Sequence, residues 1–409
     1  MFPEPQGALM AGKFARSTRA APRSKVEQPS RHQMVATTTR RPCSAWHCWS
    51  AYLAAFVVAL LLAPVLQGRW PESPLFNGLL LTSASTTVVF AFSFLADNSS
   101  VYDPYWVLAP LHLAFVWKAQ APGGFWFYEP RETACMVLLW VWALRFTIMV
   151  PWEGWKRGLV HEDWRYDQIR RQIADFGKTL RKETVQDPYA SLASPPCFPA
   201  SDLDKWKELA QIASGLVGAL LYWQVSLVSL HLTPSLLVYC ALCPLGRVVL
   251  QGSAAPPLCA LDGVATLLTA AGIALEAIAD EQLRSWQRAH PAARTACRRG
   301  LWRFSRHPNY CGECTFWSGL LLFAVAADAL RAEPWLAAGA ALMWAFFRVA
   351  SVPLMDARSL GRRSDYVQVM ASTSALLLMP PGFRIGALRA VDAPLAGGTA
   401  AGLGKERVE

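Results

Sequence analysis

Residues 51–67 read AYLAAFVVALLLAPVLQ, an unbroken apolar stretch without a charged side chain. A helix of about this length can cross the roughly 30 Å hydrocarbon layer of a bilayer. Comparable blocks recur along the chain, and we assign eight predicted spans, at residues 51–67, 76–96, 105–121, 133–152, 209–232, 259–279, 315–330 and 335–355. The sequence therefore predicts an all-α fold, a polytopic transmembrane helical bundle of about eight spans with a range of seven to nine.

A ninth apolar block, residues 235–250, is shorter than the others. It contains Pro244 and Arg247, and both residues are unfavourable inside a helix that faces lipid. We therefore expect this block to be re-entrant or interfacial rather than a further span.

The basic residues gather in a few connecting segments of the chain. The net charge is +10 over 409 residues, and Lys and Arg concentrate in residues 1–45, 153–208 and 281–306 and after Asp356. Eight spans that start from a cytosolic N-terminus place all these segments on one side, which is the positive-inside pattern. We therefore predict that both termini are cytosolic. The positive charge then gives no reason to expect a nucleic-acid partner.

The two ends of the chain differ in composition from the apolar blocks. Residues 1–45 are rich in Arg, Ser, Thr and Ala, which is typical of a disordered basic extension or of an organellar transit peptide. Residues 382–409 are rich in Gly and Ala and are expected to form a disordered tail. The predicted transmembrane domain spans residues 46–381.

The ten cysteines do not suggest a disulfide framework, because several lie in apolar blocks and others in loops predicted to face a reducing compartment. The close pairs are Cys240/Cys243 and Cys311/Cys314, and His307 precedes the second pair. Neither pair has the second ligand pair of a structural zinc site. We predict no metal site.

Charged side chains inside the predicted spans are informative, because a charge in hydrocarbon is costly and marks functional sites. Glu276 and Asp280 lie four residues apart, hence on one face of the sixth predicted span. Arg145 lies in the fourth span and Arg348 in the eighth. The carboxylate pair requires a cation nearby, whereas an arginine can also extend to the interface.

The densest polar segment is SRHPNYCGE, residues 305–313, between the sixth and seventh predicted spans. Pro308 excludes an ordinary helix interior at this point, and Arg and His side chains suit an anionic ligand. Two further polar groups, residues 162–166 and 356–366, are predicted to lie on the same membrane face. Each group alone would suit lipid headgroups, but three on one face favour a single ligand site.

These motifs occur together, in this order, in a known family. The SRHPNY segment followed by Gly312 and Glu313 resembles the C-terminal signature of the steroid 5-alpha-reductase superfamily, and the DUF1295 membrane proteins are the most similar branch. The stretches DWRY (163–166), EAIADEQ (276–282) and PLMD (353–356) fit that branch as well. The resemblance covers roughly residues 95–381. It departs from the family pattern at Asp356, where Glu is expected, and at Cys311, where a bulkier apolar residue is usual.

The resemblance implies a membrane reductase that transfers a hydride from NADPH to a conjugated C=C bond in a sterol or other isoprenoid lipid. It implies cofactor contacts at Asp280, Gln282, Arg306, His307, Asn309, Tyr310, Glu313, Asp356, Arg362, Arg363 and Tyr366. NADPH is anionic and would enter from the cytosol, where the basic clusters are predicted. The expected location is the endoplasmic reticulum membrane, with an organellar membrane as the alternative.

No catalytic acid can be assigned from the sequence. The polar residues Tyr128, Glu129 and Glu132 are available, but the predicted topology places them at the opposite membrane face. Two other functions therefore stay open. One is an S-adenosylmethionine-dependent membrane methyltransferase of the isoprenylcysteine or phospholipid type, because such enzymes carry a similar Arg-His-Pro-x-Tyr motif. The other is a non-catalytic lipid-binding membrane protein.

Overall fold

A computed structural model describes residues 43–126, 128–149, 162–185 and 215–383. These residues form helices and no strand, apart from one isolated bridge between Ser305 and Ser374. The all-α prediction is confirmed for this part of the chain. The predicted N-terminal extension, except for residues 43–45, lies outside the described residues, as do most of the loop 153–208 and nearly all of the predicted tail.

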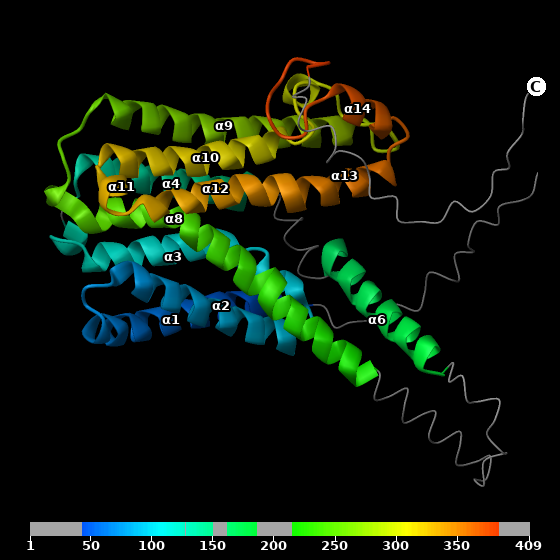
Figure 1. Ribbon diagram of the computed structural model, residues 1–409, viewed down its shortest axis with the longest axis horizontal. Coiled ribbons are helices and arrows are strands. Elements are labelled where there is room, and N and C mark those ends of the chain that lie inside the picture. Colours follow the sequence, from blue (N-terminus) through cyan, green and yellow to red (C-terminus); the bar gives the residue numbers. More distant parts are fainter. Residues whose placement is uncertain (1–42, 127, 150–161, 186–214, 384–409) are drawn as a thin grey trace, which may run out of the picture. The chain divides into compact units, whose positions relative to one another are not determined.

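The described residues form a series of helices along the chain (Figure 1). The α-helices are α1 (Ala45–Arg69), α2 (Pro74–Leu95), α3 (Tyr105–Gln120), α4 (Pro130–Met149), α6 (Trp164–Val185), α8 (Thr233–Gln251), α9 (Ala260–Ala289), α10 (Pro308–Ala326), α11 (Ala329–Ala332), α12 (Ala337–Phe346), α13 (Val352–Leu360) and α14 (Tyr366–Ser372). The 3₁₀-helical turns include η2 (Ser99–Tyr102), η5 (Gly252–Ala254) and η6 (Gly300–Arg303). The π-helical turns are η4 (Ser226–Leu232) and η8 (Phe347–Ser351).

Five helical segments are long and apolar enough to cross a membrane. They are Ala45–Arg69, Pro74–Leu95, Gly215–Ala254, Ala260–Ala289 and Pro334–Leu360. The chain is therefore a polytopic α-helical membrane protein. The remaining predicted spans fall in α3, α4 and α10, which are not among these five, so the number of eight stays a prediction.

The predicted fifth span and the predicted re-entrant block form one continuous helix, Gly215–Ala254. In Figure 1 the green ribbon of α8 continues without a break into the helical segment before it. The π-helical turn η4 precedes Pro234, and its longer i→i+5 pattern accommodates a residue that lacks a backbone N–H. The re-entrant interpretation of residues 235–250 is therefore wrong.

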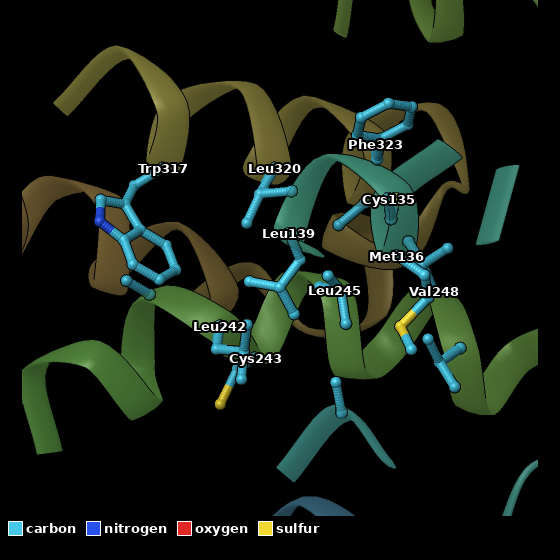
Figure 2. Packing of buried hydrophobic residues seen from close by; sticks show 14 of the residues in the cluster. Cys135, Met136, Leu139, Leu242, Cys243, Leu245, Val248, Trp317, Leu320 and Phe323 are labelled. Atoms are coloured by element: carbon cyan, nitrogen blue, oxygen red, sulfur yellow. The ribbon is translucent and has the colours of Figure 1, made fainter. Parts of the chain in front are cut away.

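The main apolar core lies where α3, α4, α8, α10 and α12 meet. Figure 2 shows part of it, with Leu139 of α4 facing Leu242 and Leu245 of α8 and Trp317 and Leu320 of α10. All five side chains are fully buried. This packing holds α4 against α8 and α10, and thereby positions the polar side chains that α4 and α10 carry.

The pair α9 and α10 packs with its backbones in close approach (Figure 1). A Cβ atom added at Gly272 would lie 2.5 Å from the backbone nitrogen of Phe316, and one added at Gly312 would lie 2.7 Å from the nitrogen of Glu276. Small residues at such crossings let membrane helices approach closely. The contact brings Glu276 and Asp280 of α9 beside Asn309 and Glu313 of α10.

Candidate functional site

Four of the predicted site residues form a buried cluster around the Asp356 carboxylate. Oδ2 accepts a hydrogen bond from Nη2 of Arg306 at 2.8 Å, and Oδ1 lies 2.9 Å from Nε2 of His307. The Tyr366 hydroxyl also donates to Oδ1, at 2.5 Å. Burial and then the neighbouring carboxylate raise the pKa of Tyr366, so its hydroxyl stays protonated and remains a donor. We call these four residues the Asp356 cluster.

The Asp356 cluster ties the segment before α10 to the segment after α14. The Arg306 guanidinium donates to the carbonyl oxygens of Met370 and Thr373 at 3.3 and 2.9 Å, and its backbone N–H donates to Ser374 at 2.8 Å. All four cluster side chains are buried. Arg306 and His307 therefore make hydrogen bonds within the protein. These hydrogen bonds shape the site by holding α10 and α14 together.

A second group, which we call the carboxylate floor, consists of Glu276, Asp280 and Glu313. Arg145 of α4 lies between the two α9 carboxylates, with Nη2 2.6 Å from Glu276 and Nη1 3.1 Å from Asp280. Asn309 donates from Nδ2 to Asp280 at 3.2 Å, and its Oδ1 has no hydrogen-bond partner among the described residues. The floor itself comes from α9 and α10, and α4 supplies the arginine that pairs with it.

Glu313 is the deepest member of the carboxylate floor. Its two oxygens accept hydrogen bonds from the indole nitrogens of Trp142 and Trp317, at 2.9 and 2.8 Å. Trp142 stacks on Phe316 with ring centroids 5.1 Å apart. Both donors are neutral, so they orient the carboxyl group without compensating its charge.

A third group, the arginine rim, consists of Arg165, Arg358, Arg362 and Arg363. It comes from the start of α6, from α13 and from the turn before α14, and Arg358 lies within electrostatic range of the other three. Arg165 forms an ion pair with Asp163 at 2.8 Å and lies 3.7 Å from Asp103. Arginines gathered at this density repel one another, so an anionic ligand would stabilise the rim.

The start of α6 is attached to the bundle by polar contacts. Tyr166 donates a hydrogen bond to Asp103, and Glu162 accepts from the backbone N–H of Ser99 at 2.9 Å and from the Tyr222 hydroxyl at 3.1 Å. Trp164 packs under the Arg358 guanidinium, 3.9 Å from the ring centre. These contacts place Arg165 next to α13.

Tyr310 lies between the three groups. Its ring stacks on His307, with centroids 5.3 Å apart and planes within 9°. Its hydroxyl is within electrostatic range of Arg165 in the rim and of Asp280 and Glu276 in the floor. The arginine rim, Tyr310 and the carboxylate floor therefore belong to one site. This site lies toward the C-terminal end of α9, the end that leads into the basic segment 281–306.

The family model described as "Protein of unknown function (DUF1295)" matches residues 89–185 and 204–373, which is well over half of the chain. The chain belongs to the DUF1295 family. This is the steroid 5-alpha-reductase-like family domain. No curated protein and no solved structure matches the chain.

The DUF1295 match contains every predicted site residue, but one of them lies apart from the groups described above. Gln282 accepts the backbone N–H of Leu301 at 2.8 Å, where Gly300 has a positive φ of 55° and leaves no space for a Cβ atom. Its side chain braces the turn η6 and lines an open cleft of about 450 Å³ that also contains Trp286 and Arg299.

The acidic residues near the start of α4 lie far from the DUF1295 site. Glu132 forms an ion pair with Lys118 at 2.7 Å, and both side chains are buried. Arg145 lies thirteen positions after Glu132 in α4, which is about 20 Å of helix. The structure thus brings neither Glu132 nor its neighbours to the site, and a catalytic acid is still unassigned.

The cofactor contacts implied by the resemblance do not include Arg145, Glu276, Trp142, Arg165 and Arg358, although Arg165 and Arg358 lie in the polar groups 162–166 and 356–366 that were predicted to share one ligand site. Arg145 and Glu276 stood out as charges within predicted spans, and that signal was sufficient to nominate them. The contact between Trp142 and Glu313 joins residues 171 positions apart, so no local sequence pattern could predict it. Among the described residues, no group of His, Cys, Asp and Glu is arranged to hold a metal ion.

Proposed function

We propose that this protein is a membrane-embedded, NADPH-dependent reductase of a conjugated C=C bond in a sterol or other isoprenoid lipid. The observation that carries the proposal is the arginine rim beside a deeper polar floor, in a chain whose family domain is steroid 5-alpha-reductase-like. We further propose that it resides in the endoplasmic reticulum membrane, with an organellar membrane as the alternative.

The arginine rim suits the phosphate groups of NADPH. A planar guanidinium can donate two parallel hydrogen bonds to a phosphate, and Arg362 is exposed to solvent. The extra 2′-phosphate adds charge that distinguishes NADPH from NADH, and an accumulation of arginines is what such a phosphate requires. The topology predicted from the positive-inside pattern would present these arginines to the cytosol, where the cofactor is found.

The deeper residues suit the other end of the cofactor. The Asn309 amide oxygen is buried without a hydrogen-bond partner among the described residues, so it could accept a hydrogen bond from a ligand amide. When bound, NADPH supplies the hydride for reduction of the double bond. The protein's own residues would position the cofactor. The arginine rim would hold its phosphates, and Asn309 and Asp280 would orient its nicotinamide end. The buried core of α4, α8 and α10 would exclude water.

Two alternatives predict different ligands for the same site. A methyltransferase would bind S-adenosylmethionine, whose sulfonium cation suits the carboxylate floor but whose lack of phosphates leaves the arginine rim unused. A lipid-binding protein would bind neither compound. The rim favours the reductase, since it is built for an anion.

Binding to the detergent-purified protein tests the proposal. NADPH, NADH and S-adenosylmethionine are each titrated against the full chain, with Asn309→Ala as the site variant and Gln287→Ala, at an exposed position of α9, as the control. We expect saturable NADPH binding that is weaker for NADH and is reduced by Asn309→Ala but not by the control. Binding of S-adenosylmethionine alone would identify the methyltransferase, and binding of none would leave the lipid-binding protein.

A further inference from the structure

A small pocket lies between α1, α2 and α3, and none of these helices contributes a side chain to the rim, the floor or the Asp356 cluster. The pocket encloses about 20 Å³ and is partly open to its surroundings. Four polar side chains line it, those of Thr82, Ser85, Tyr105 and His112. The other described residues that line it are apolar, so the lining contains no charged carboxylate, lysine or arginine.

His112 is the polar group of this pocket that the protein leaves unpaired. Its Nδ1 atom is buried and has no hydrogen-bond partner in the described part of the chain. The neighbouring rings of Phe56 and Tyr105 have their centroids 4.9 and 6.4 Å from the imidazole. The hydroxyl groups of the pocket are better provided for, because Ser85 donates to a carbonyl oxygen of α1 at 3.1 Å and Tyr105 interacts with Ser85 and Thr86.

An unpaired imidazole is unfavourable at this place in the fold. Both α1 and α2 are long and apolar enough to cross a membrane, so we place the pocket between them within the hydrocarbon layer. A polar group in hydrocarbon has no water to bind, and such a group commonly marks a ligand site. A neutral imidazole offers one donor and one acceptor. A hydroxyl group, which also donates and accepts, is its natural complement.

We propose that this pocket binds the hydroxyl group of a neutral membrane lipid alcohol, with His112 as the hydrogen-bond partner. A cavity of about 20 Å³ has room for one water-sized group, so the hydroxyl enters and the apolar body of the lipid stays outside. Phe115 offers a surface for that body, since it is 42% exposed and its ring lies 6.2 Å from that of Phe56. The uncharged lining disfavours a phosphate or carboxylate headgroup.

The inference goes beyond the proposed function and does not rest on it. The pocket uses a face of α3 different from the one that carries Trp106, whose ring lies 5.8 Å from that of Trp142 beside the carboxylate floor. Thr82 and Ser85 precede residue 89, where the DUF1295 match begins. The pocket is therefore built in part by helices that the family match does not include, and binding to it can be measured without a nucleotide.

Photolabelling of the full chain in phosphatidylcholine nanodiscs tests the proposal. The probes are a sterol alcohol and a long-chain alkyl alcohol, each with a diazirine close to its hydroxyl, and the methyl ether of each. Peptide mass spectrometry locates the label. We expect at least one alcohol to label peptides of α1, α2 or α3 saturably, and the unlabelled alcohol to compete. The methyl ether should label less, because it cannot donate a hydrogen bond and its methyl group exceeds the space in the pocket.

Two variants with matched controls assign the binding to the pocket. His112→Phe keeps an aromatic ring without its nitrogens, and its control is His290→Phe at the exposed end of α9. Ala109→Leu places a larger side chain in the lining of the pocket, and its control is Ala270→Leu at an exposed position of α9. We expect His112→Phe to weaken labelling by about two- to tenfold, the range that one net hydrogen bond supplies. Ala109→Leu should weaken it as well, and both controls should label as the wild type does.

Three results would overturn the inference. The first is the absence of saturable labelling of α1, α2 and α3 by either alcohol, which would leave the pocket to a single water molecule. The second is equal labelling by an alcohol and its methyl ether. The third is competition by phosphatidylglycerol that matches competition by the unlabelled alcohol. Ala109→Leu keeps the assignment testable should His112→Phe fail to fold, and undiminished labelling of a folded Ala109→Leu protein would also contradict it.

Discussion

At the scale of single residues, Asp356 links positions that are far apart in the chain. It joins Arg306 and His307, about fifty positions earlier, to Tyr366 on the following helix. The sequence predicted that these residues belong together, because the resemblance placed all of them in one site. It could not predict that they bind one another, since a motif does not record where its side chains point.

Asp356→Asn is expected to destabilise the protein strongly. The variant keeps the shape of the side chain but leaves the buried Arg306 guanidinium without its carboxylate. Breaking a buried ion pair on one side costs about 3–5 kcal/mol. Thermal unfolding in detergent should show a clearly lower midpoint for this variant.

The control for that measurement is Glu281→Gln, which removes an acid at a largely exposed ion pair with Arg284 and Arg288. Exposed pairs contribute about 0–1 kcal/mol, so its midpoint should stay near the wild-type value. Equal midpoints for Asp356→Asn and the wild type would show that the Asp356 cluster does not hold the fold.

At the scale of helices, the site depends on how closely α9 and α10 approach. Apolar blocks predicted most of these helices, because length and hydropathy are local properties. The continuous helix Gly215–Ala254 was missed, since two blocks separated by Pro234 look like two elements in the sequence. The π-helical turn η4 that joins them depends on buried contacts such as the one between His231 and Ser93, at 3.0 Å.

Gly312→Ala is expected to separate α9 from α10 and to weaken the site. The added methyl group would meet the α9 backbone at Glu276, and backbone cannot move aside as a flexible side chain can. Overpacking of this kind costs about 1–3 kcal/mol. Both the unfolding midpoint and NADPH binding should fall.

Gly263→Ala is the matched control on α9, because nothing lies within 4 Å of the added methyl group. Alanine is favoured over glycine within a helix by about 0.5–1 kcal/mol, so this variant should be unchanged or slightly more stable. A Gly312→Ala protein with wild-type stability and binding would contradict the close approach of the two helices.

At the scale of the whole molecule, the predicted topology places the two ends of α9 on opposite membrane faces. The helix contains 30 residues, or about 45 Å, which is enough to cross a bilayer. Ser253 lies just before α9 and Ala289 at its end, and both are exposed. The charge pattern of the chain predicts this orientation, because it is a property of whole segments and not of single contacts.

Cysteines introduced at these positions test the topology. In a Cys259→Ser background, a membrane-impermeant maleimide should label Ala289→Cys in sealed vesicles with the cytosolic face outward. Ser253→Cys should react only after permeabilisation, and peptide mass spectrometry assigns each label to its position. Labelling of both positions from the same side would contradict the orientation of α9.

The central claim is that the arginine rim holds the phosphates of NADPH, and the most direct test is the NADPH affinity of Arg362→Ala. The control is Arg331→Ala, in α11, where the arginine side chain is 83% exposed. Losing one charge-assisted phosphate contact costs about 1.5–3 kcal/mol, so the account predicts a dissociation constant at least about tenfold higher for Arg362→Ala and unchanged for Arg331→Ala. An unchanged affinity in Arg362→Ala, or equal losses in both variants, would contradict it.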